Sequence, residues 1–189
     1  MIDKRLEKLA YILVNHSLRI KKNDLFVISG SHLAAPLIKE VYRQALRLGA
    51  NPYTKIFIDN LSEVYYKNAS EKQLKHVSPI AKFEIKNIDA RLAILSPSNK
   101  RNMTNVDPKK QAINSAAQQE IHQIFLDRAA KKELRWCLTQ YPTNAAAQDA
   151  DMSLEEYEDF IFEAAHVGEK NPISYWKKVF GEQEKIRKF

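Results

Sequence analysis

The side chains that most often bind metal ions or act as nucleophiles are scattered along this chain. Histidines stand at positions 16, 32, 76, 122 and 166, and no two lie within four residues of each other. A helix or turn that binds a metal ion usually presents two ligands at short spacing. We therefore assign no catalytic and no metal-binding residue, although a site built from residues far apart in sequence stays open. Cys137 stands among apolar residues with no histidine beside it, which predicts a buried and inert thiol.

Three polar segments offer other chemistry, because each follows an apolar run that reads as a strand: 29–32, 96–102 and 139–144. Ligands of an open α/β sheet usually bind beyond the carboxyl ends of its strands. The first segment could hold an anion at a helix N-terminus, but Gly30 in a tight turn and Ser31 as a helix cap explain it more simply. Lys100 and Arg101 could bind a carboxylate or phosphate, or be solvated loop charges.

A run of acids, Glu155, Glu156, Glu158 and Asp159, could suggest paired carboxylates for acid–base chemistry. It follows Ser153, which forms a capping box with Glu156. Acids in a first helical turn are also explained by the helix dipole, and we prefer this reading.

The elements that must position these residues alternate along the chain. Apolar runs predict strands at 25–29, 53–58, 91–96 and 134–139, and helical periodicity covers 2–14, 33–48, 113–128 and 154–164. Alternating strands and crossover helices predict a three-layer α/β/α domain with a mostly parallel sheet, Rossmann-like or flavodoxin-like. We expect residues 1–189 to form this single domain, with two or three helices after the last strand.

Composition narrows the function. Only four of the 189 residues are glycine, and none of the glycine-rich loops that bind dinucleotides or nucleoside triphosphates can be written. The net charge of +7 comes from scattered basic pairs without a compact stripe, so we expect no nucleic-acid partner. No apolar run is long enough to span a membrane. A single cysteine fits a reducing cytoplasm.

Several segments, in order along nearly the whole chain, resemble one family. These are 35–38, 46–52, 107–110, 133–136, 141–145 and 152–158, with Arg135-Trp136 and Tyr141-Pro142-Thr143 the most specific. They look like the N-terminal domain of the M29 metallopeptidases, the thermophilic aminopeptidases of the T/S type.

The resemblance implies a cytoplasmic, homodimeric enzyme that removes N-terminal residues from peptides with two divalent metal ions, cobalt, zinc or magnesium. In such chemistry the metals polarise the scissile carbonyl and supply hydroxide, and a glutamate acts as base. The family's metal ligands, base and tyrosine lie in a C-terminal domain, and no position here matches them.

We therefore expect the chain to be the N-terminal half of a longer two-domain enzyme, without cofactor and inactive by itself. Its C-terminal catalytic domain would be its partner. Asn99, Arg101 and Thr143 are the residues that could face the substrate cleft. The alternative is a stand-alone α/β domain that binds a small ligand or regulates another protein.

Overall fold

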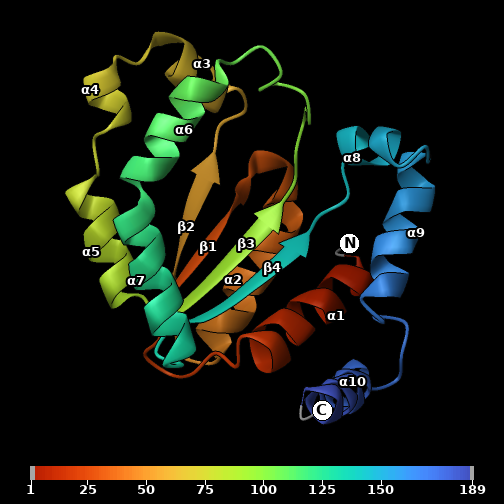
Figure 1. The fold of residues 1–189 in the computed structure, drawn as a ribbon. Helices are drawn as coiled ribbons and strands as arrows, with labels where there is room; N and C mark the ends of the chain where they lie inside the picture. Colours follow the sequence, from red (N-terminus) through yellow and green to blue (C-terminus); the bar gives the residue numbers. More distant parts are fainter. Residues whose placement is uncertain (1–2, 188–189) are drawn as a thin grey trace.

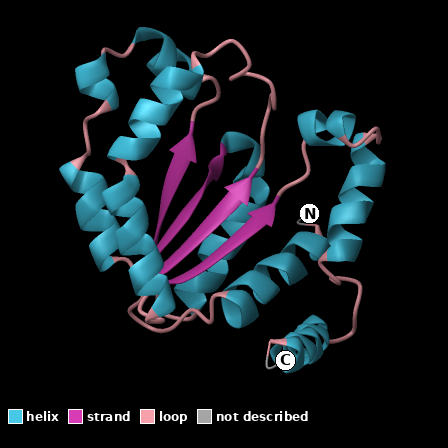
Figure 2. Ribbon diagram, viewed as in Figure 1, coloured by secondary structure: helices cyan, strands magenta, loops and turns pink. Residues whose placement is uncertain are grey.

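The computed structural model describes residues 3–187. Within this range one sheet forms, from β1 (Leu25–Ser31), β2 (Asn51–Phe57), β3 (Ala90–Leu95) and β4 (Arg135–Gln140). All neighbouring strands are parallel and their order is β2-β1-β3-β4 (Figure 1). Helices cover both faces (Figure 2). The predicted three-layer α/β/α fold is thus confirmed, and each predicted strand is present with ends shifted by one or two residues.

One face of the sheet carries α1 (Lys4–Ile12), the π-helical turn η1 (Leu13–Ser17) and α2 (Ala35–Arg47). Apolar side chains of these helices pack on the even-numbered residues of β1 and β3, including Phe26, Ile28 and Leu92, which are fully buried. The α2 helix is capped by Leu48 and followed by Gly49, whose φ of 77° is the left-handed conformation that favours glycine after a helix. Within the described residues, both amphipathic stripes predicted for this layer therefore form helices, and Ile2 of the first stripe lies outside the described residues.

The other face is covered mainly by α5 (Pro79–Asn87) and α7 (Gln119–Ala130). A smaller core joins Val27 to Ile85, Ile88 and Leu134. Beyond the carboxyl end of β2 lie α3 (Leu61–Asn68), α4 (Glu71–Leu74) and α6 (Pro108–Ala117). The connection from β2 to β3 consists of α3, α4 and α5, whereas α6 follows β3.

The long helix predicted over 113–128 is wrong in one respect, because it is broken. Gln118, at φ −81° and ψ 0°, is both the last residue bonded to α6 and the residue before α7. The break lets α6 pack on α4 while α7 packs on α5. Tertiary contacts therefore divide a segment whose apolar periodicity predicts one continuous helix.

After β4 the chain forms α8 (Asn144–Asp149), α9 (Leu154–Ala164) and α10 (Pro172–Ile186). The predicted capping box is present: the Ser153 hydroxyl accepts from the amide of Glu156, whose carboxylate accepts from the amide of Ser153. Phe162 and Val167 join the core beneath α1 and α2, which places α9 beyond the β4 edge of the sheet (Figure 1). Among the described residues, no helix is both long and apolar enough to cross a membrane.

Candidate functional site

The carboxyl ends of β1 and β3 are joined by two buried serines. The Ser31 hydroxyl donates to the carbonyl of Ser96 at 2.7 Å, and the Ser31 amide donates to the Ser96 hydroxyl at 3.1 Å. Ser31 also accepts from the amide of Leu33 at 3.3 Å, so it caps the short helix that follows. The capping role is confirmed. The amides of Ser31 and Leu33, which could otherwise bind an anion, already donate to serine hydroxyls.

Gly30 is not in a turn, as the sequence suggested, but inside β1. A Cβ at this position would lie 3.3 Å from both the Cβ and the carbonyl oxygen of Ile94. The glycine therefore allows β1 and β3 to approach closely where their carboxyl ends meet.

The first polar loop also reaches the end of β2. The Nδ1 of His32 lies 3.8 Å from Oδ2 of Asp59, and the His32 side chain is 65% exposed. This is a long contact on the surface, and it does not by itself indicate a catalytic role for His32.

The second loop is organised by its own polar side chains. Asn99 accepts from the amide of Arg101 at 2.8 Å, which shapes a tight turn. Lys100 pairs with Asp149 of α8 at 2.6 Å, and this hydrogen bond holds the pKa of Asp149 below its usual value. Arg101 approaches Asp149 only to 4.0 Å and its side chain is 84% exposed. The structure thus brings the loops after β3 and β4 together and leaves the Arg101 guanidinium open to solvent.

Thr143 differs from the other two residues expected at the cleft. It is buried, and its hydroxyl accepts from the amide of Ala146 at 3.3 Å as the N-cap of α8. Its observed contact is structural. That Asn99, Arg101 and Thr143 face a substrate stays a prediction.

Cys137 is half-buried rather than buried. It packs against the core beneath α1, and burial raises the pKa of its thiol, an effect that a hydrogen bond with Ser17 partly offsets. A raised pKa lowers the thiolate fraction at neutral pH, which agrees with an inert thiol.

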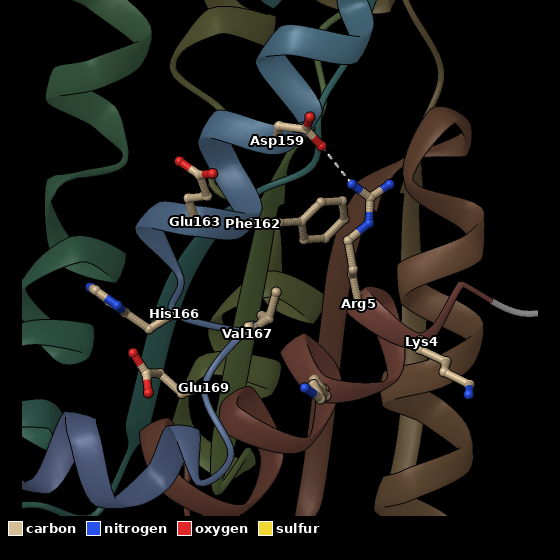
Figure 3. A pocket seen from close by; sticks show the side chains of 10 residues that line it. Lys4, Arg5, Asp159, Phe162, Glu163, His166, Val167 and Glu169 are labelled. Atoms are coloured by element: carbon tan, nitrogen blue, oxygen red, sulfur yellow. Dashed lines mark hydrogen bonds and ion pairs between the residues drawn. The ribbon is translucent and has the colours of Figure 1, made fainter.

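A hollow of about 590 Å³ lies between the start of α1 and the segment from α9 to Glu169 (Figure 3). On one side Arg5 donates to Asp159 at 2.8 Å, and its guanidinium lies 4.5 Å from the centre of the Phe162 ring. Arg5 also pairs with Asp3, and this hydrogen bond lowers the pKa of the Asp3 carboxyl. His166 points away from Arg5 and stacks on Tyr175, 3.7 Å between ring centres.

This network was missed from the sequence, because Arg5 and Asp159 are 154 residues apart and no local pattern links them. The charge of Arg5 is matched by the carboxylates around it, so the arrangement ties α1 to α9 and leaves little charge to attract an anion.

Across residues 3–187, no three histidine, cysteine, aspartate or glutamate side chains lie together in a way that could hold a metal ion. Of the acids at the start of α9, Glu156 forms the capping box, and Glu158 and Asp159 pair with Arg5. The described part of the chain therefore offers no ligand set that fits a metal centre.

Comparison with known proteins places this fold. The family model described as thermophilic metalloprotease (M29) matches residues 2–189. Wild-type AmpT from Thermus thermophilus has a similar structure, with a TM-score of 0.71 and 21% sequence identity over 94% of this chain. The match covers 46% of the AmpT chain, so this chain spans about half the length of that protein. No curated protein matches the chain significantly. Because the family match extends over nearly the whole sequence, the chain belongs to the M29 family of metalloproteases.

Proposed function

We propose that this chain is the N-terminal half of a two-domain, metal-dependent aminopeptidase that releases N-terminal residues from peptides. The observation that carries the proposal is the M29 family match over residues 2–189. The 46% coverage of AmpT supports the division into halves, since a second half of similar size would remain to carry the metal site.

In this proposal the chain shapes one wall of the peptide cleft. The loop after β3 supports that role, because Arg101 projects a largely exposed guanidinium beside Asn99. A guanidinium at that place could bind a carboxylate of a peptide. Two divalent ions, cobalt, zinc or magnesium, and the catalytic base would belong to the second half, since residues 3–187 present no fitting ligand set.

We further propose that the full-length enzyme is a cytoplasmic homodimer. The single cysteine supports a reducing compartment, because the chain cannot form an internal disulfide. A dimer is what the family resemblance implies.

The test compares the purified 189-residue chain with the protein encoded by the complete coding sequence. Both are incubated with cobalt or zinc and a chromogenic leucine amide. We expect metal-dependent hydrolysis by the longer protein and none by the chain alone. Metal-dependent turnover by the chain alone would overturn its assignment as an inactive half.

The alternative, a stand-alone domain that binds a small ligand, gives a different result. A thermal-shift screen with nucleotides and sugar phosphates would then find a specific stabilising ligand. The longer gene product would show no aminopeptidase activity.

A further inference from the structure

The β4 strand ends the sheet with an open edge. Its pairing with β3 uses the odd-numbered residues: the amide of Arg135 donates to Asp89, and the amide of Tyr141 donates to Leu95. In a parallel ladder the residues between them turn their N–H and C=O groups the other way. The backbone groups of Trp136, Leu138 and Gln140 therefore point away from β3, where no strand within residues 3–187 lies.

Beyond this edge the structure already provides one wall for another strand. A hollow of about 430 Å³ runs beside β4 and is bounded by η1, α1, α9 and α10. Its apolar lining includes Leu9, Leu13, Ile161, Trp176 and Phe180. A side chain entering from the position next to β4 would meet these groups, as the side chains of β3 meet the core beneath α1.

The opposite face of β4 is also apolar and thinly covered. Trp136 is 55% exposed and Leu138 is 54% exposed. They border a second hollow, of about 370 Å³, against α7. An edge strand usually carries charge that discourages pairing, but the one charged residue of β4, Arg135, is at its start and is held by Asp24.

We propose that a fifth strand completes the sheet beside β4, and that it comes from the second half of the full-length polypeptide. The observed order β2-β1-β3-β4 is the beginning of the flavodoxin-like order 2-1-3-4-5, whose last strand occupies this position. The chain following β4 forms helices instead, so the vacancy is not filled from within the described residues. This inference rests on the proposed two-domain enzyme.

The source of the strand is inferred from the geometry of a dimer at this edge and from the length of the AmpT chain. A second copy that paired its own β4 here about a two-fold axis would form one continuous sheet, with α9 and α10 of both copies on the same face. Each copy's helices would then occupy the space beneath the other copy's β4. A single strand needs no such space. More than half of the AmpT chain lies outside the matched region, and a tethered strand binds at high effective concentration.

Amide hydrogen exchange tests the proposal, because outward and inward amides alternate along β4. In the 189-residue chain, the amides of Trp136, Leu138 and Gln140 should exchange fast while those of Cys137 and Thr139 are protected. In the full-length protein, the three outward amides should exchange about 100-fold more slowly, because a new strand accepts from them. Fast exchange of these amides in full-length protein that hydrolyses peptides would overturn this inference and leave the proposed function intact.

Two variants of the full-length protein sharpen the test. Leu138→Pro removes an outward N–H that β3 does not use and puts a ring at that edge, whereas Leu138→Ala also loses the leucine side chain but keeps that N–H. We expect the proline variant to lose the protection of Trp136 and Gln140 and the alanine variant to keep it. If both variants keep the protection, strand pairing is excluded.

If something other than this strand occupies the β4 edge, the same experiments give different outcomes, and each of them contradicts the proposal. Protection of the outward amides in the 189-residue chain, together with a dimeric mass in analytical ultracentrifugation, would assign the edge to a second copy. Protection that appears in the full-length protein only after a peptide substrate is added would assign it to substrate. A coding sequence that ends at codon 189 would remove the strand altogether.

Discussion

Arg135, at the start of β4, forms an ion pair with Asp24, with 2.8 Å between Nη2 and Oδ1, and this pair spans the amino end of the sheet past β3. Its guanidinium also donates to the carbonyls of Arg19, at 2.7 Å, and Asp89, at 3.3 Å. Asp24 is buried and accepts from the amide of Lys21. The pair thus joins the segments that precede β1, β3 and β4.

We expect Arg135→Gln to lower the free energy of unfolding by about 1.5–3 kcal/mol, because it leaves a buried carboxylate and two carbonyls without their charged donor. Urea denaturation of the chain measures this. Arg187→Gln is the control, since Arg187 is 76% exposed and such a change usually stays within about 0.5 kcal/mol. Equal effects of the two substitutions would contradict a special role for Arg135.

Gly30→Ala should destabilise the protein by about 1–3 kcal/mol, because a Cβ 3.3 Å from Ile94 forces β1 and β3 apart. Gly168→Ala is the matched control, because a Cβ there would have no atom within 4 Å. Thermal unfolding of both variants checks the difference, and a Gly30→Ala protein as stable as Gly168→Ala would show that the strands have room.

Stability should fall as the pH drops from about 7 to 5 in a way that depends on His16. Burial, with Arg19 and Lys177 nearby, lowers the pKa of this imidazole in the folded protein. Protons below about pH 6.5 therefore bind the unfolded chain more readily and favour unfolding. The urea midpoint at the two pH values measures the loss. His16→Gln should reduce the pH dependence, while His122→Gln, at an exposed position, should not.

Thr143→Ala should cost about 0.5–2 kcal/mol, because the N-cap of α8 loses the hydroxyl that accepts from Ala146. Thr143→Ser keeps that oxygen and should retain most of the stability. Guanidinium denaturation of the three proteins distinguishes them. If alanine and serine behave alike, the hydroxyl contributes nothing as a cap.

Local patterns were sufficient for most elements of this fold. Apolar runs located every strand, and the caps predicted at Ser31 and Ser153 stand at helix starts in the structure. These predictions succeed because capping and side-chain periodicity depend on residues only a few positions apart. Family membership could also be inferred, from short segments spread along the chain.

Long-range contacts decided the rest. The sequence left the strand order open, and only the packed sheet shows that β4 is an edge with outward backbone groups. The break at Gln118, the close approach at Gly30 and the burial of Thr143 also depend on neighbours distant in sequence. The free energy of contacts between segments distant in sequence cannot be predicted from patterns of neighbouring residues. The chain alone therefore specified its elements and its family, whereas tertiary packing decided which polar groups meet, which are buried and which edge of the sheet stays open.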